Sequence, residues 1–210
     1  VNADALPNAF GYMAGAKASY PLGNGMLFGS AEWAKTDPYL YLRDGGDRDQ
    51  DQGEYGINWV VALREFNSSS GITYTEDFIG YQYGCDAIVY NANLGYKVFG
   101  KWSLEGNIFY MIHGTHDKWT TWGGQGDAAQ DTETTPTTTH VTDNNGDLNA
   151  DERNAASYTF VVGAHGGYTI LKGLEVYGQV DYIHITNPGN INTNAPISDV
   201  QITAGVKYSL

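Results

Sequence analysis

The segment GLEVYGQVDYIHI, residues 173–185, alternates between apolar and polar side chains, and its interpretation decides the fold of the chain. A period of two residues is typical of a β-strand with one apolar and one polar face. The apolar positions are Leu174, Val176, Gly178, Val180 and Tyr182, and the other face carries Glu175, Tyr177, Gln179 and Asp181. In a soluble sheet the apolar face packs on a core. In a transmembrane barrel it contacts lipid and the polar face lines the interior, so one strand alone is compatible with both.

The composition limits what the chain can be. Its 210 residues suit one domain. The formal net charge of −13 argues against nucleic-acid binding, which needs a basic surface, and against attraction to anionic lipid headgroups. The single cysteine, Cys85, excludes an internal disulfide framework and a cysteine-rich zinc site. No apolar run approaches the roughly 20 residues of a membrane-spanning helix.

The alternation recurs along the chain while helical periodicity is almost absent, so the sequence predicts an all-β fold. It is clear in AIVYNANLGYKV (87–98), WSLEGNIFYMIHG (102–114), SYTFVVGAHGGYTI (157–170) and DVQITAGVKYSL (199–210). We expect strands near residues 9–20, 26–42, 55–66, 72–83, 87–98, 101–116, 156–170, 173–185 and 199–210. Bacterial single-chain barrels have even strand counts, so this odd total predicts eight strands if two merge, or ten if one N-terminal strand is lacking. The range 26–42 is suspect because Pro38 interrupts it.

Short and long connections follow one another between these strands. The short ones are PLGNG (21–25), NSSSG (67–71), FGKW (99–102) and LKG (171–173), and the long ones are 43–56, 117–156 and 186–198. Two of the long ones are acidic. Short turns at one end and long loops at the other predict an antiparallel up-and-down barrel, with short periplasmic turns and long acidic extracellular loops.

The aromatic residues favour a membrane over a soluble sandwich or a lipocalin-like barrel. On the apolar face, one group lies close to the tight turns and another toward the long loops. The groups are Tyr20, Trp102, Tyr168 and Tyr208, and Tyr90, Tyr110, Tyr158 and Tyr182. Amphipathic aromatic side chains collect at the two lipid–water boundaries. We therefore predict one transmembrane β-barrel domain over residues 1–210, in contact with the lipid of the outer membrane of a Gram-negative bacterium.

From about residue 87 onward the chain resembles the closing strands of omptin-type outer-membrane barrels. The matching pieces are LGYKVFGKWSLEGNIFYM (94–111), YTFVVGAHGGYTILKGLEVYGQVDY (158–182) and ITAGVKYSL (202–210). The resemblance implies a ten-stranded barrel in which two acidic residues and an Asp–His pair at the extracellular rim activate water for peptide cleavage. This chain lacks the Asp-x-His motif, and its nearest candidates are the adjacent, reversed His116 and Asp117. Because neighbours in a strand point to opposite faces, we predict no catalytic residues.

The segment DNNGDLNADE (143–152) resembles a shortened EF-hand loop, with Leu148 in place of the invariant glycine. Oxygen-bearing side chains recur at alternate positions and end on a glutamate. The candidate ligands are Asp143, Asn145, Asp147, Asn149, Asp151 and Glu152. Hard oxygen ligands suit Ca²⁺. The alternative is a solvated acidic loop tip in which Asp and Asn form turns.

The remaining features favour a structural or interaction protein. We expect the interior-facing His113 and His165 to complete a polar network with Glu105 and Asp181 rather than bind a metal. A barrel this small has its interior filled by side chains, which argues against passive transport. The predicted function is adhesion or assembly, through surface loops that contact a protein or surface-matrix partner. An omptin-like endopeptidase and a narrow pore are the alternatives.

Overall fold

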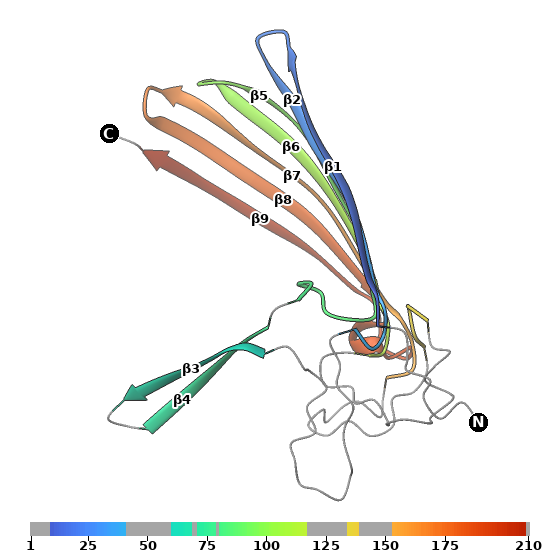
Figure 1. Ribbon diagram of the computed structural model, residues 1–210. Coiled ribbons are helices and arrows are strands. Elements are labelled where there is room, and N and C mark those ends of the chain that lie inside the picture. Colours follow the sequence, from blue (N-terminus) through green and yellow to red (C-terminus); the bar gives the residue numbers. More distant parts are fainter. Residues whose placement is uncertain are drawn as a thin grey trace, which may run out of the picture. The chain divides into compact units, whose positions relative to one another are not determined.

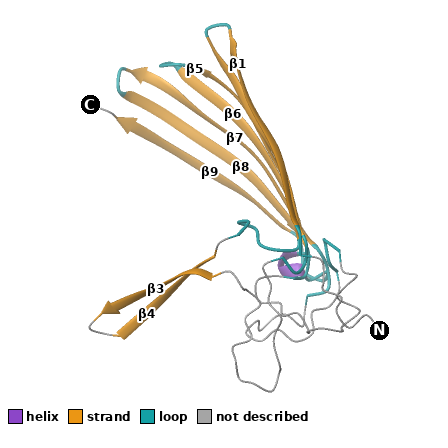
Figure 2. Cartoon of the chain, viewed as in Figure 1, coloured by secondary structure: helices purple, strands orange, loops and turns teal. Residues whose placement is uncertain are grey.

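The computed structural model describes residues 9–40, 60–68, 71–78, 80–116, 134–138 and 153–208. These residues confirm the all-β prediction (Figure 2). The strands are β1 (Gly11–Leu22), β2 (Gly25–Thr36), β3 (Val60–Ser68), β4 (Gly71–Phe78), β5 (Ala87–Val98), β6 (Trp102–His113), β7 (Ser157–Leu171), β8 (Leu174–Thr186) and β9 (Ile197–Tyr208). A single 3-10 turn, η3 (Pro188–Asn190), is the one helical element of the described ranges, in which no helix is long and apolar enough to cross a membrane.

Among the described residues, seven strands form one antiparallel sheet in the order β1-β2-β5-β6-β7-β8-β9 (Figure 1). Except between β2 and β5, neighbours in the sheet are also neighbours in the sequence, as the up-and-down prediction requires. β3 and β4 form a separate two-stranded hairpin. The sheet is open, with β1 and β9 at its ends, so the antiparallel plan is confirmed and the closed barrel is not.

Three hairpins of this sheet have tight turns where the sequence predicted them. Each turn contains a glycine with positive φ: Gly23 at 57°, Gly100 at 69° and Gly173 at 84°. Glycine adopts this left-handed region without a steric penalty. The strand expected over 26–42 is shorter than predicted, because β2 ends at Thr36, two residues before Pro38.

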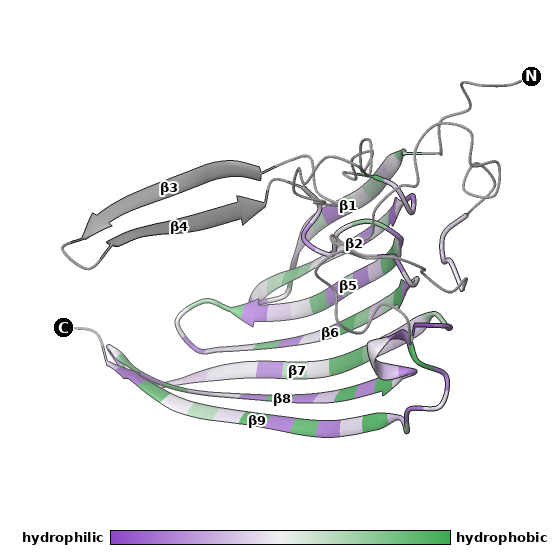
Figure 3. Cartoon of the chain, turned by 90° about the horizontal axis from the view of Figure 1, so that it is seen from below, coloured by the Kyte–Doolittle hydropathy of each residue, from purple (hydrophilic) through white to green (hydrophobic). Residues whose placement is uncertain are grey.

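The register confirms that alternate residues of neighbouring strands share a face. On one side of β8, Val180 lies opposite Ala164 of β7 and Ile202 of β9. On the other side, Gln179 lies opposite His165 and Thr203. We call these the apolar face and the polar face, and the alternating bands of hydropathy along the strands are visible in Figure 3.

The apolar face is not covered by any described segment of the sheet's own unit. Its large side chains are exposed, including Leu94 at 62%, Leu104 at 57% and Ile202 at 76%. Within the described ranges, the buried hydrophobic side chains are Ala34, Tyr39, Cys85, Ala87, Val89 and Ala156. The sheet therefore does not pack its apolar face on a core of its own.

Glycines on the polar face make room for larger neighbours. A Cβ at Gly163 would collide with the Asp181 carboxylate, and one at Gly205 would collide with the ring of Tyr177. Both pairs lie directly opposite one another in the register. The glycines thus allow bulky side chains to lie flat across this face.

The chain divides into two compact units. The sheet unit comprises residues 12–35, 88–112 and 156–210. The loop unit comprises residues 1–11, 36–87 and 113–155 and contains the segments that connect several strands.

Candidate functional site

The predicted calcium ligands, Asp143, Asn145, Asp147, Asn149, Asp151 and Glu152, lie outside the described residues. So does Asp117, whereas His116 is described. Among the residues that the structure does describe, no three His, Cys, Asp or Glu side chains are grouped as metal ligands. The calcium site therefore stays a prediction.

The loop unit contains a cluster of buried polar side chains that we call the Asp86 cluster. Its members come from four short segments: Tyr39 follows β2, Asp86 precedes β5, Thr115 and His116 follow β6, and Thr137 lies in 134–138. Asp86 and Thr115 are fully buried, and the other three are at most 5% exposed. Buried polar groups need partners, and this cluster supplies them internally.

Asp86 stands at the centre of the cluster. Its backbone is left-handed, with φ 55°, a conformation that Asp tolerates better than most residues. Its amide donates to the Asp37 carbonyl at 3.1 Å, and its carbonyl accepts from the Gly114 amide at 2.8 Å. Position 114 has to be glycine, because a Cβ there would collide with the Asp86 carboxylate.

The Asp86 carboxylate accepts hydrogen bonds from two residues. The backbone N–H of His116 donates to Oδ2 and that of Thr137 donates to Oδ1, each at 3.1 Å. The Thr137 hydroxyl donates to Oδ2 at 2.5 Å. Burial nevertheless raises the pKa of Asp86, because the desolvation of the carboxylate outweighs the Thr137 hydrogen bond, the nearby His116 and the two amides.

A row of hydrogen bonds continues from Asp86 through His116 to Tyr39. His116 Nδ1 lies 2.9 Å from Thr137 Oγ1 and 3.8 Å from Asp86 Oδ2. Because the Thr137 proton is directed to Asp86, the network assigns Nδ1 of His116 as a donor. Nε2 lies 3.0 Å from the Tyr39 hydroxyl, within hydrogen-bond distance. The Tyr39 and His116 rings meet edge to face at 5.0 Å.

Further hydrogen bonds connect the same segments. The Thr135 hydroxyl donates to the Thr36 carbonyl at 2.6 Å, and the Thr36 hydroxyl accepts from the Ala87 amide at 3.0 Å. The Arg153 guanidinium donates to the Thr115 carbonyl at 3.1 Å. The carboxylate, hydroxyls and imidazole of this site therefore hold four chain segments together by hydrogen bonds.

This cluster was not predicted from the sequence. The predicted neighbour of His116 was the adjacent Asp117, whereas in the structure the His116 amide donates to Asp86, 30 residues earlier. The available signal was weak: Asp86 lies between Gly84 and a strongly alternating strand, at a position typical of a turn.

A second set of polar contacts crosses the polar face of the sheet unit. The Ser30 hydroxyl donates to Asn93 Oδ1 at 2.8 Å, and Asn93 Nδ2 donates to Glu105 Oε1 at 2.8 Å. Glu105 Oε2 lies 3.4 Å from His165 Nε2. This polar row joins β2, β5, β6 and β7, and it brings together His165 and Glu105, two members of the polar network expected from the sequence.

The other expected members of that network have different partners. His113 Nδ1 donates to the Gly114 carbonyl at 2.8 Å. The Asp181 carboxylate accepts from Gln179 Nε2 at 2.6 Å.

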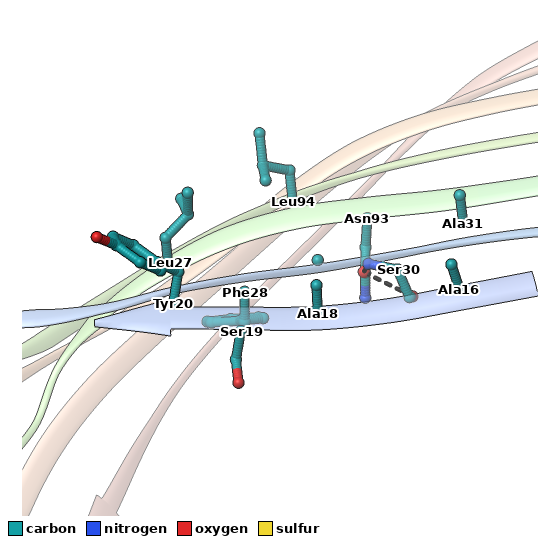
Figure 4. Close-up of a pocket in the computed structure, with 11 residues that line it drawn as sticks. Ala16, Ala18, Ser19, Tyr20, Leu27, Phe28, Ser30, Ala31, Asn93 and Leu94 are labelled. Carbon is teal, nitrogen blue, oxygen red and sulfur yellow. Dashed lines mark hydrogen bonds between the residues drawn. The ribbon is translucent and has the colours of Figure 1, made fainter. Parts of the chain in front are cut away.

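The opposite face of the same strands carries a shallow groove of about 300 Å³. Figure 4 shows Tyr20, Leu27 and Leu94 projecting on the groove side of β1, β2 and β5. The dashed Ser30–Asn93 hydrogen bond in that view belongs to the polar row. Small side chains form the floor of the groove: Ala16, Ala18, Gly29 and Ala31.

The chain matches no protein-family model, and comparisons with curated proteins and with solved structures give no match either.

Proposed function

We propose that the sheet unit is the wall of a β-barrel in the outer membrane of a Gram-negative bacterium, with its apolar face against lipid. The observation that carries this proposal is the exposure of that face along the strands of the sheet. Exposed apolar patches on soluble monomers rarely exceed a few hundred Å². A continuous face of exposed Leu, Ile, Val and Tyr needs an apolar environment, and lipid supplies it.

The exposed aromatic side chains support the same placement. Toward the tight turns they are Tyr20, Trp102, Tyr168 and Tyr208, and toward the other strand ends they include Tyr90 and Tyr182. Tyr90 and Tyr110 stack on neighbouring strands, with ring centroids 6.4 Å apart. Along β6, Trp102 and Tyr110 are separated by roughly 27 Å at about 3.4 Å per residue. At a tilt of about 40° this separation spans about 21 Å of membrane thickness, which is comparable with an apolar band about 25 Å tall.

The polar face suits a filled interior. The polar row satisfies Ser30, Asn93, Glu105 and His165 by contacts between strands, and glycines let Asp181 and Tyr177 lie across the face. Side chains arranged in this way fill a small barrel, which argues against the narrow-pore alternative.

We further propose that the protein works through its connecting segments, as a structural or interaction protein at the cell surface. The Asp86 cluster supports this, because its hydrogen bonds hold together the segments that follow β2 and β6 and the segment that precedes β5. Connecting segments held in one arrangement can present a defined surface to a protein or surface-matrix partner. Calcium bound by residues 143–152 would hold that segment in one conformation as well. This part of the proposal rests on the sequence alone.

One observation bears on the endopeptidase alternative, namely the contact between His116 and Asp86. An omptin-like mechanism needs an Asp–His pair that reaches a water and a substrate. Here both side chains are at most 3% exposed, and the carboxylate already accepts from the Thr137 hydroxyl and two amides. The geometry supports a structural role for the contact between Asp86 and His116 rather than a role in peptide hydrolysis.

The placement is tested by arginine substitutions at adjacent positions of β8. Val180→Arg places a charge on the apolar face, which costs about 2–4 kcal/mol near the bilayer midplane, so we expect poor insertion. Gln179→Arg is the matched control on the polar face and should insert nearly normally. Heat-modifiable gel migration measures the folded fraction, and equal defects in the two variants would contradict the assignment of the faces.

A further inference from the structure

A serine and a histidine lie next to each other where β8 ends and β9 begins. Ser198 Oγ lies 2.8 Å from His184 Nδ1, and the register places the two residues directly opposite one another. Ser198 is exposed and His184 is partly buried. A hydroxyl within hydrogen-bond reach of an imidazole is the arrangement that activates serine as a nucleophile, when a third group orients the imidazole.

The second nitrogen of this imidazole has a partner that can orient it. His184 Nε2 lies 3.3 Å from the Thr186 hydroxyl, two residues along the same strand. In the tautomer that carries its proton on Nε2, this nitrogen donates to Thr186 and Nδ1 accepts from Ser198. The Tyr182 hydroxyl donates to Ser198 Oγ at 3.4 Å, and a tyrosine hydroxyl in such a position can stabilise a developing oxyanion.

These side chains lie on the apolar face, close to one of its exposed aromatic side chains. In the register His184 is opposite Phe160 of β7, and Tyr182 is opposite Val200 of β9. His184 follows Tyr182 by two residues, or about 7 Å along the strand. In the membrane placement proposed above, Tyr182 lies at a lipid–water boundary. The ester groups that join acyl chains to lipid headgroups lie at the same boundary.

We propose that Ser198 and His184 form a catalytic pair that hydrolyses the acyl ester of a membrane lipid. This activity goes beyond the structural or interaction role of the connecting segments, and its substrate class rests on the proposed membrane placement. The pair differs from the Asp86 cluster in its access. Asp86 and His116 are at most 3% exposed, whereas Ser198 is exposed on the side that contacts lipid.

The reaction uses water as its second substrate. Ser198 Oγ attacks the ester carbonyl carbon while its proton passes to His184 Nδ1, and the Tyr182 hydroxyl donates to the oxyanion. The bond between that carbon and the alcohol oxygen then breaks, and the alcohol leaves with the proton from His184. Water next attacks the acyl-serine and gives a proton to Nδ1. The fatty acid leaves as Ser198 Oγ recovers that proton. Thr186 acts as a positioning residue.

The first test is covalent labelling with fluorophosphonates, in which the serine oxygen forms a bond to phosphorus and fluoride leaves. The probes are a hexadecyl fluorophosphonate in phospholipid vesicles and an ethyl fluorophosphonate in detergent. We expect mass spectrometry to find the label on Ser198. Ser198→Ala should abolish it, and His184→Gln should slow it by about 100-fold or more. The matched control is Ser157→Ala, because the Ser157 hydroxyl donates to the Thr186 carbonyl and not to an imidazole.

The second test measures the fatty acid released from vesicles of phosphatidylethanolamine and phosphatidylglycerol, with or without lipopolysaccharide. The two compositions distinguish a glycerolipid ester from an ester of lipopolysaccharide. Thr186→Val should lower kcat while leaving KM nearly unchanged, and Thr186→Ser, which keeps the hydroxyl, should restore kcat. Heat-modifiable gel migration checks that each variant is folded.

Four results would overturn the proposal. They are the absence of label on Ser198 in the folded parent chain, equal labelling of the parent and His184→Gln, fatty-acid release that persists in Ser198→Ala, and labelling of Ser198 without fatty-acid release from either vesicle. A failure of the membrane placement is distinguishable from these. It would appear as equal insertion defects of Val180→Arg and Gln179→Arg, whereas the ethyl probe reports on the catalytic pair in detergent.

Discussion

At the scale of the residue, Asp86 shows how a costly buried acid can be held in place. Its carboxylate is desolvated, yet the Thr137 hydroxyl and two backbone amides donate to it. A buried acceptor left without such donors costs about 1–3 kcal/mol. The carboxylate therefore has all of its donors only when the segments that carry Asp86, His116 and Thr137 come together.

The raised pKa of Asp86 predicts how the loop unit responds to pH. The folded-state pKa lies above the unfolded value near 3.8, so the stabilising contribution is fully present below that value. It is lost as pH rises through the folded pKa, because the folded state then gives up a proton that it held more tightly than the unfolded chain. Asp86→Asn removes this titration. We expect the stability difference between parent and variant to change by up to about 1.4 kcal/mol per pH unit across that window.

Hydrogen exchange of the Gly114, His116 and Thr137 amides measures the local stability of the Asp86 cluster at each pH, after correction for the intrinsic pH dependence of exchange. Protection in the parent, relative to Asp86→Asn, should decrease as pH rises above 3.8. A parent-to-variant ratio that stays constant with pH, or that rises, contradicts the account of a desolvated carboxylate.

At the scale of the element, the strands follow from the sequence but their partners do not. Alternation of side chains fixes which residues of β7, β8 and β9 share a face, and the register bears this out. It carries no information about which strand lies next to which. The pairing of β2 with β5, and the separation of the β3–β4 hairpin from the main sheet, could not be derived from periodicity.

Glycines on the polar face give a prediction at this scale. Gly163→Ala places a methyl group against the Asp181 carboxylate and Asn107 Oδ1, and overpacking of this kind costs about 1–3 kcal/mol. Gly106, on the adjacent β6, is the matched control, because its nearest atom would lie 3.7 Å from an added Cβ. Thermal unfolding in detergent should show a lower midpoint for Gly163→Ala and an unchanged or higher midpoint for Gly106→Ala. Equal midpoints would contradict the close packing of this face.

At the scale of the whole molecule, the sequence predicted the all-β class, the antiparallel plan and the tight turns. It also predicted a polar network on the polar face, of which His165 and Glu105 are in contact while His113 and Asp181 have other partners. It missed the Asp86 cluster, whose members are distant in the sequence and meet only through the path of the connecting segments. Loop geometry depends on such long-range contacts, whereas strand faces depend on local spacing.

The calcium prediction concerns the acidic segment 143–152. Several carboxylates within ten residues repel one another unless a cation lies among them, so millimolar Ca²⁺ should protect the segment against protease. Asp143→Ala combined with Asp147→Ala should remove this protection. Sodium at equal ionic strength is the control, and equal protection by sodium would show charge screening instead.

The central claim, that the apolar face contacts lipid, is tested most directly by a cysteine scan along β8. Spin labels at residues 174–186, each in a Cys85→Ser chain reconstituted into lipid vesicles, report collisions with oxygen, which dissolves in lipid. The account predicts high oxygen accessibility at Val176, Gly178, Val180 and Tyr182 and low accessibility at Glu175, Tyr177, Gln179 and Asp181. An alternation of the opposite phase, or labels that respond only to a water-soluble relaxer, would contradict it.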